Sequence, residues 1–310
     1  MTSIQRIAFS SAITSVLALT PLAAQAGSSA TASAGQLSFQ LIDLDVNDNV
    51  VSTYTLLPSA SQSSVFGTTV SVSASDTSLG AADSASKSRA DVFFPITLEA
   101  SSGNARAQAD VTAASVTASG EAGGKGTSFN ASAITGSSQN SYYYNSIYAI
   151  DLSPRSVLLV TARVDATAFA GNAQCSSTSY YSTSCGTESS SANAAMSLSY
   201  SYYATGVNAN YSFNDSVNVS AYASGNYGYR YDPLTGWGTY GYWPTDDQSS
   251  SSGKWLTAVF TNSTDSFQRA TLGLSASVQG YATTAIPEAG TSAMFALGLL
   301  GLAGVARRRA

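Results

Sequence analysis

Histidine is absent from this 310-residue sequence, and charged residues make up only 10% of it. Without histidine, the chain lacks the usual general base for serine or cysteine nucleophiles and the commonest metal ligand. Two cysteines alone are too few to fill a tetrahedral zinc site. The sequence also contains no G-x-S-x-G elbow, P-loop or dinucleotide-binding glycine motif. These absences exclude most hydrolase, metalloenzyme and nucleotide-binding classes, and no cofactor is expected.

The charge that is present is mainly acidic, with a net charge of -5 and a pI near 4.6. No basic stripe is available to neutralise phosphates, so nucleic acid is not an expected partner. Serine and threonine exceed a quarter of the residues, so hydroxyl groups rather than charges must keep the protein soluble. Valine, leucine, phenylalanine and tyrosine recur throughout, which argues against disorder and favours an extracellular β protein.

The N-terminal residues 1–26 have the pattern of a signal peptide. Arg6 supplies the positive charge before an apolar run, and Ala24 and Ala26 form a small-x-small cleavage site. Cleavage is expected before Gly27, after export by Sec-type machinery. The body of the protein is then predicted to be residues 27–285.

Residues 286–310 combine three elements in order. The elements are Pro287 with Glu288, an uncharged segment from Thr291 to Ala306, and a basic cluster of Arg307, Arg308 and Arg309. As a helix the uncharged segment would be roughly 24 Å long, slightly short of a bilayer core, so flanking residues must contribute to the span. The basic cluster is typical of a cytoplasmic flank. The segment is therefore predicted to be a transmembrane helix.

This tail resembles the PEP-CTERM sorting signal, which occurs on exported proteins of Gram-negative bacteria and is handled by the membrane peptidase exosortase. The resemblance implies an inner-membrane-anchored precursor that is cut near Pro287 and Glu288. It also implies a mature protein at the cell surface or in the extracellular matrix, linked to exopolysaccharide. The family usually has Pro-Glu-Pro, whereas Ala289 holds the third position here. Whether this Pro-Glu-Ala form of the signal is cleaved therefore stays open, and an uncut C-terminal anchor is the alternative.

Two pairs of segments in the body have the pattern of β-hairpins. Gln36 to Asp45 and Val50 to Leu56 flank the turn residues Asn47-Asp48-Asn49, while Lys254 to Thr261 and Ser266 to Tyr281 flank a second turn. The Ser/Ala/Gly stretch before the first pair, residues 27–35, is expected to be a mobile lead-in.

Short internal motifs extend the resemblance. The first hairpin is similar to the opening hairpin of many PEP-CTERM proteins. Leu152-Ser153-Pro154 and Phe260-Thr261-Asn262 also look like a recurring element of that family, in which the first motif opens one strand and the second ends another. Ser156 to Ala168 alternates apolar and polar residues and predicts a strand with one buried face.

Taken together, these patterns predict an all-β body with an antiparallel β-sandwich or jelly-roll-like fold. One domain or two domains splitting near 136–155 are both compatible with its length. Cys175 and Cys185 enclose nine residues that are all serine, threonine or tyrosine. In an exported protein this pair is expected to form a disulfide.

Three sets of residues invite a functional interpretation. Aromatic residues gather in the candidate glycan-stacking set Tyr227, Tyr229, Tyr231, Trp237, Tyr240 and Trp243. Tyrosine is also a common strand residue, so this set has a structural interpretation too. Asp43 with Asp45 and Asp246 with Asp247 are the obvious carboxylate pairs for a glycosidase. Because all four lie among turn residues, solvated roles are favoured, and for Asp43 and Asp45 an Asx turn is favoured over a Ca²⁺ site.

The sequence therefore predicts a non-enzymatic structural protein of the cell surface or biofilm matrix, sorted by exosortase and able to meet extracellular polysaccharide. A carbohydrate-binding adhesin that uses an aromatic surface at 222–243 is the first alternative. A glycoside hydrolase that uses only carboxylates is the second.

Overall fold

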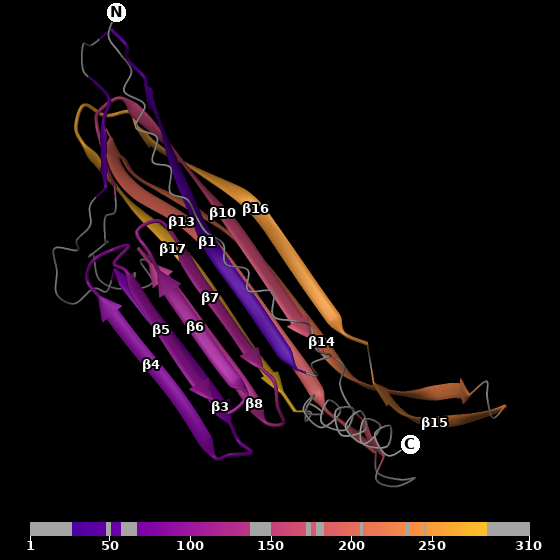
Figure 1. The fold of residues 1–310 in the computed structure, drawn as a ribbon. Coiled ribbons are helices and arrows are strands. Elements are labelled where there is room, and N and C mark those ends of the chain that lie inside the picture. The colour runs from indigo at the N-terminus through magenta and orange to yellow at the C-terminus, as the bar shows by residue number, and fades with distance from the viewer. Residues whose placement is uncertain are drawn as a thin grey trace, which may run out of the picture.

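The computed structural model describes residues 27–47, 51–56, 67–136, 150–171, 175–177, 183–204, 207–232, 236–244 and 246–283. The predicted signal peptide and sorting tail lie outside these residues. The described chain folds into curled antiparallel sheets (Figure 1), which confirms the predicted all-β class. None of the described residues belongs to a helix long and apolar enough to cross a membrane.

The first sheet has six strands in the order β16-β10-β1-β7-β6-β5. Its members are β1 (Ser28–Asp43), β5 (Ile96–Ser102), β6 (Ala105–Val111), β7 (Val116–Ala122), β10 (Ser156–Ala170) and β16 (Gln248–Asn262). The strand β1 therefore lies in the middle of the sheet, between β10 and β7.

The second sheet has nine strands, seven of them in the order β15-β14-β13-β17-β8-β3-β4. Its members are β2 (Tyr54–Leu56), β3 (Thr68–Asp76), β4 (Ala81–Arg89), β8 (Thr127–Thr135), β9 (Ile150–Leu152), β13 (Thr187–Ala204), β14 (Val207–Asp232), β15 (Trp237–Pro244) and β17 (Gln268–Ala282). The short strand β9 pairs with β17 and β2. A separate hairpin is formed by β11 (Cys175–Ser177) and β12 (Thr183–Cys185).

Each sheet buries one face in a common core, because apolar residues recur at every second position of the strands. In β10 the buried face carries Leu158, Val160, Ala162, Val164, Ala166 and Ala168, as the alternation predicts, and continues to Ser156 and Ala170 at the two ends of the strand. Strands from before and after residues 136–155 contribute to the same core and pair with each other in both sheets. Alanine is the commonest residue in this core, so much of the space between the sheets is filled by small side chains.

Both predicted hairpins are wrong. After Asp43 the chain leaves β1 in the six-stranded sheet and enters β2, which pairs with β9 in the other sheet. Likewise, β16 pairs with β10 while the next strand, β17, pairs with β13 and β8. The apolar faces of β16 and β17 do share the interior, as expected from their alternation, but they enter it from opposite sheets.

The predicted mobile lead-in is also wrong, since residues 28–35 are the first half of the central strand β1. Ala30, Ala32 and Ala34 are at most 3% exposed. A β-bulge then shifts the register between Gly35 and Ser38, with Gln36 at a φ of 54°.

A two-stranded arm extends β14 beyond the body. Residues up to Ser224 pair with β13, whereas Gly225 to Asp232 pair only with β15. The arm projects from one end of the sheets, near the β11–β12 hairpin (Figure 1). It carries all six residues of the candidate glycan-stacking set.

Candidate functional site

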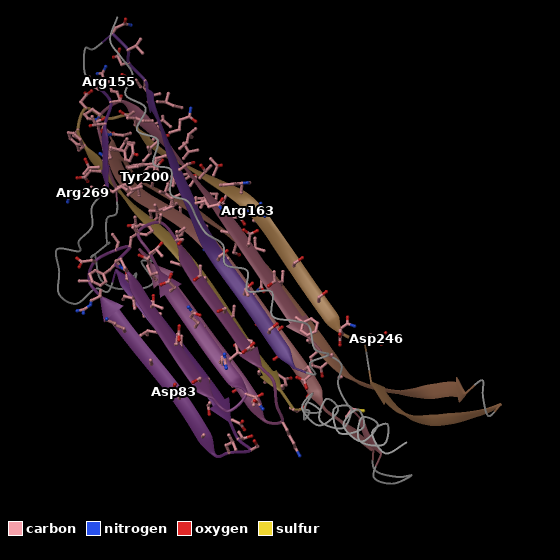
Figure 2. The ribbon with its side chains drawn as sticks, in the orientation of Figure 1. Asp83, Arg155, Arg163, Tyr200, Asp246 and Arg269 are labelled. Atoms are coloured by element: carbon pink, nitrogen blue, oxygen red, sulfur yellow. The ribbon has the colours of Figure 1, made fainter. Side chains whose placement is uncertain are left out.

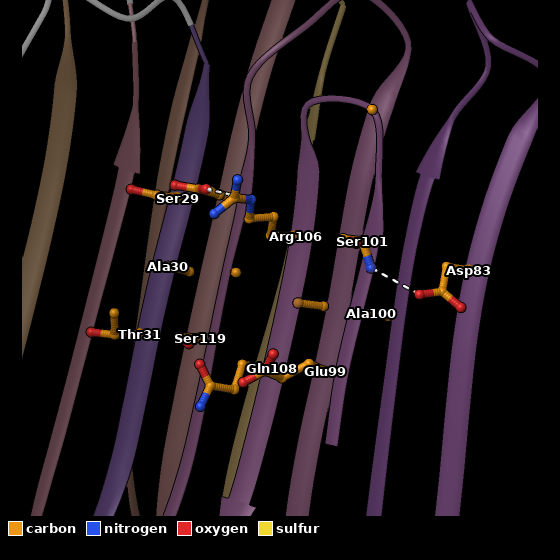
Figure 3. A pocket seen from close by; sticks show the side chains of 14 residues that line it. Ser29, Ala30, Thr31, Asp83, Glu99, Ala100, Ser101, Arg106, Gln108 and Ser119 are labelled. Atoms are coloured by element: carbon orange, nitrogen blue, oxygen red, sulfur yellow. Dashed lines mark hydrogen bonds and ion pairs between the residues drawn. The ribbon is translucent and has the colours of Figure 1, made fainter. Parts of the chain in front are cut away.

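A polar groove of about 740 Å³ lies on the outer face of the six-stranded sheet (Figure 3). Its side chains occupy the outward positions of β1, β5, β6 and β7, because the alternate positions of these strands are buried in the core. Cross-strand pairing aligns them in two rows. One row is Ser29, Glu121, Arg106 and Ser101, and the next is Thr31, Ser119, Gln108 and Glu99.

One side of the groove is completed by the edge strand β4 of the other sheet. Asp83 Oδ2 accepts a hydrogen bond from the backbone N–H of Ser101, at 2.9 Å. The groove therefore contains three carboxylates, from Asp83, Glu99 and Glu121, against the single guanidinium of Arg106. Arg106 Nε lies 3.7 Å from Glu121 Oε1, and both side chains are mostly exposed. The surface is acidic, rich in hydrogen-bonding groups and shallow.

The β3–β4 hairpin that carries Asp83 is fixed by a buried carboxylate in its turn. Asp76 Oδ1 accepts hydrogen bonds from Ser78 Oγ, from Ser78 N at 3.0 Å and from Leu79 N at 3.3 Å. The Ser78 hydroxyl is the largest cause that lowers the pKa of Asp76, and the backbone N–H groups act in the same direction. At the opposite edge of the body, Lys254 Nζ binds Asp215 Oδ1 at 2.6 Å and lowers the pKa of Asp215.

These lowered pKa values predict acid sensitivity. A carboxylate whose pKa is lower in the folded state stabilises the fold above about pH 4, and this contribution is lost as the pH falls further. We therefore expect the melting temperature of the wild type to decrease when the pH is lowered below about 4. The melting temperature of an Asp76→Asn, Asp215→Asn variant should be lower than that of the wild type at pH 7 and should change less as the pH is lowered. Thermal melts from pH 7 to pH 2 test this, with the exposed Asp246→Asn variant as control. An equal acid response in the double variant and the wild type would contradict it.

Of the candidate pair, Asp43 is the last residue of β1 and Asp45 lies in the connection that follows. Asp43 Oδ1 accepts from Asp45 N at 2.9 Å, and Asp45 Oδ1 accepts from Asn47 N at 3.3 Å, so the Asx-turn interpretation is confirmed. Asp45 also binds the guanidinium of Arg155 at 2.6 Å. Among the described residues, no group of three or more histidine, cysteine or acidic residues is placed to hold a metal ion.

Arg155 joins this connection to the one between β16 and β17. Its Nη2 lies 2.9 Å from Asp265 Oδ1, and its backbone N–H donates to Thr264 O. Asp265 and then Asp45 raise the pKa of Arg155, so the guanidinium stays charged. The residue adopts a φ of 48°, which is uncommon for a side chain of this size.

The motifs at 152–154 and 260–262 meet at the same corner of the body. Register pairs Ser156 with Asn262 and Leu158 with Phe260. The buried Asn262 side chain donates from Nδ2 to Leu152 O at 3.1 Å and to Ser153 O at 2.8 Å. Two motifs that are about a hundred residues apart in the sequence thus form one structural element.

The other candidate pair, Asp246 and Asp247, is exposed in the connection before β16. Asp246 lies near the base of the arm, whereas Arg155 and its partner Asp45 lie at the far end of the body (Figure 2). The full length of β16, about 50 Å, separates these ends. The two carboxylate pairs therefore do not form a joint acid and base site.

The register of the arm divides the candidate glycan-stacking residues between two faces. Tyr229 pairs with Tyr240 and Tyr227 with Tyr242, so these positions and Tyr231 share one face. Trp237 pairs with Asp232 and Trp243 with Asn226, which places both tryptophan positions on the other face. The sequence pattern alone did not separate these two groups.

At the base of the arm, the β11–β12 register places Cys175 opposite Cys185. Cys185 is disulfide-bonded, and the chain has only these two cysteines. We expect a Cys175→Ser, Cys185→Ser variant to lose roughly 2 to 3 kcal/mol of unfolding free energy, because the unfolded chain is no longer constrained. Urea denaturation measures this loss, and a Ser176→Ala, Ser184→Ala variant within the same hairpin is the control. Equal midpoints for the cysteine variant and the wild type would contradict the expectation.

Comparison of the chain with protein-family models, with curated proteins and with solved structures gives no match.

Proposed function

We propose that this protein is a non-enzymatic structural component of the cell surface or exopolysaccharide matrix, exported by Sec-type machinery and sorted by exosortase. Its body would be an antiparallel β-sandwich, with jelly-roll-like connections that cross between the sheets. The sequence supports the sorting route through the signal-peptide pattern at 1–26 and the tail elements Pro287, Glu288 and Arg307 to Arg309.

The outward faces of the long strands are the observation that carries this proposal. They are joined across strands by hydroxyl pairs, for example Thr31 with Thr167 at 2.6 Å and Ser75 with Ser128 at 2.7 Å. Such pairs stabilise a sheet without charge and leave hydroxyl groups available to water or to a polymer. A low-charge scaffold of this kind suits a passive role in a hydrated matrix.

Export and processing test the proposal. The full-length chain is expressed in an exosortase-bearing host, the cells are fractionated, and the intact mass of the product is measured. We expect a product that begins at Gly27, ends near Glu288 and lies outside the inner membrane. A product that keeps Arg307 to Arg309 in the inner membrane would contradict the sorting route.

Two variants sharpen this test. Ala289→Pro restores the usual Pro-Glu-Pro element and should accelerate processing, whereas Glu288→Ala should block it. If neither variant changes the amount of processed product, cleavage does not depend on this element.

A carbohydrate-binding adhesin is the second candidate function. The register of the arm favours it, because the positions of Tyr227, Tyr229, Tyr231 and Tyr240 fall on one face. Affinity electrophoresis on the host polysaccharide would then show a loss of binding for Tyr229→Ala, Tyr240→Ala. Comparison with Trp237→Ala, Trp243→Ala would show which face is used. Unchanged mobility of both variants would reject the arm as the adhesive surface.

A further inference from the structure

Trp255 is an exposed aromatic residue on the outer face that also carries the polar groove. It lies on β16, its side chain is 58% exposed, and its cross-strand neighbour on β10 is Arg163. The Arg163 guanidinium binds Asp165 through Nε and Nη2, with Nη2 2.6 Å from Asp165 Oδ1. Trp255 is therefore a large apolar ring that lies beside a neutralised ion pair on a solvent-exposed face.

A glycine makes room for this arrangement. Gly253 pairs with Asp165 in the β10–β16 register. A Cβ atom at Gly253 would lie 2.0 Å from Asp165 Oδ1 and 2.6 Å from Arg163 Nη2. The ion pair therefore lies flat over the glycine, and its polar atoms stay level with the sheet next to Trp255. Because Arg163 and Asp165 neutralise each other, little net charge remains beside Trp255.

The groove and Trp255 belong to one continuous surface. Thr31 lines the groove and pairs with Thr167 of β10, which is two residues from Asp165. Trp255 lies two strands across the sheet and four residues along the strands from Thr31, which is a separation of about 16 Å. The outward side chains between them are hydroxyls and the Asp165–Arg163 ion pair. A flexible polar polymer could therefore contact both ends.

We infer that this outer face binds a neutral polysaccharide chain. Trp255 stacks on the C–H face of one sugar ring, while groove residues such as Gln108, Ser119 and Glu99 exchange hydrogen bonds with hydroxyls of neighbouring sugars. The three carboxylates of the groove, against one guanidinium, disfavour an anionic polymer. This inference rests on the proposed matrix function, in which the scaffold must hold the matrix polymer.

Titration calorimetry on the full-length chain in mild detergent tests the inference. The probes are neutral hexasaccharides of glucose, mannose, galactose and N-acetylglucosamine, together with an anionic hexagalacturonate. At least one neutral probe should bind with a dissociation constant of about 1 mM. The Glu99→Gln, Glu121→Gln variant should bind the anionic probe better than the wild type does.

Matched variants locate the site. Trp255→Ala should weaken binding of the neutral probe about 5-fold to 10-fold, the size expected for one stacked ring. Phe267→Ala removes another exposed ring, 62% exposed and outside this face, and should leave binding unchanged. Gln108→Ala should also weaken binding, whereas Gln279→Ala, an exposed glutamine on the other sheet, should not.

Two results would overturn the inference. One is the absence of heat with every neutral probe at about 10 mM, well above a millimolar dissociation constant. The other is a Trp255→Ala variant that binds the neutral probe with wild-type affinity but sediments differently from the wild type. This result would show that the face is covered by a second copy of the chain. Because export is measured separately, correct export without glycan binding rejects this inference alone. Glycan binding by a chain that is not exported rejects only the proposed matrix function.

Discussion

Replacing Phe129 by alanine is expected to lower the free energy of unfolding by about 3 to 5 kcal/mol. Phe129 lies on β8 and is 3% exposed. Its ring covers two glycines, Gly280 of the neighbouring strand β17 and Gly120 of β7 in the facing sheet. Neither glycine has a side chain that could move into the cavity. The alanine variant should therefore keep most of the empty volume.

The same contact predicts that filling the glycine positions is harmful. A Cβ atom at Gly120 would stand 2.1 Å from Phe129 Cδ2, and one at Gly280 would stand 2.5 Å from Phe129 Cε1. Gly120→Val should thus destabilise the wild type by about 1 to 3 kcal/mol or more through overpacking. In the Phe129→Ala background the valine occupies vacated space, so the double variant should be more stable than the sum of the single losses implies.

Urea denaturation followed by circular dichroism measures these free energies. Phe267→Ala is the matched control, because Phe267 is 62% exposed and its loss should change stability by no more than about 0.5 kcal/mol. A loss below about 1 kcal/mol for Phe129→Ala would show that the ring does not fill the core. Strict additivity in the double variant would show that Gly120 and Phe129 do not share the same space.

The same packing shows how much of the fold the sequence could predict. Alternation with a period of two identified the all-β class and the buried face of β10, because that strand carries leucine and valine at alternate positions. In β1 the buried positions are Ala30, Ala32 and Ala34, which look like a flexible Ser/Ala/Gly segment. Such residues form a core strand only when the facing sheet is close, and that depends on residues distant in the sequence.

Strand pairing could not be predicted for a related reason. Two successive strands with apolar faces can pair in one sheet or face each other across the core, and alternation is the same in both cases. For β16 and β17 the outcome is set at the corner formed by residues 262–266. There, hydrogen bonds from Asn262 reach the strand β9 as well as the local turn. The sequence shows a turn, but not its distant partners.

The outer groove was missed because its signal is distributed. Its members come from β1, β4, β5, β6 and β7, each contributing one or two polar residues with no motif of their own. Only the register aligns Thr31, Ser119, Gln108 and Glu99 in a row. The aromatic cluster of the arm was visible in the sequence, but its division between two faces depends on the register of β14 with β15.

Replacing Asn262 by aspartate is expected to destabilise the protein by about 3 to 5 kcal/mol at pH 7, since it buries an uncompensated charge. Asn262 is 1% exposed. Its Nδ2 atom donates to the carbonyl oxygens of Leu152, Ser153 and Ser266 at 3.1, 2.8 and 2.8 Å. Its Oδ1 atom accepts from Thr264 N at 3.0 Å. An aspartate would keep the Thr264 contact but would set a second oxygen against three carbonyl oxygens.

The charge of the new carboxylate gives this prediction a pH signature. Burial among carbonyl oxygens disfavours the ionised form of the aspartate. The substitution should therefore destabilise the fold mainly at pH values above the usual titration range of an aspartate. The gap in stability between variant and wild type should be largest at neutral pH and should narrow toward about pH 4, as the carboxyl group takes up a proton. A protonated carboxyl has a single O–H for three acceptors, so some of the loss should persist.

Chemical denaturation at pH 7, 5.5 and 4 measures this gap. Asn47→Asp is the control, because Asn47 is exposed in the turn after β1 and its change should have little effect at any pH. Asn262→Ala separates charge from the lost hydrogen bonds, since it removes the same donors without adding a carboxylate. It should be destabilised less than the aspartate variant at pH 7, and by an amount that does not vary with pH. If Asn262→Asp and Asn262→Ala lose equal stability at all three pH values, the buried carboxylate adds no cost beyond the lost hydrogen bonds. The role of Asn262 at this corner would then be limited to packing.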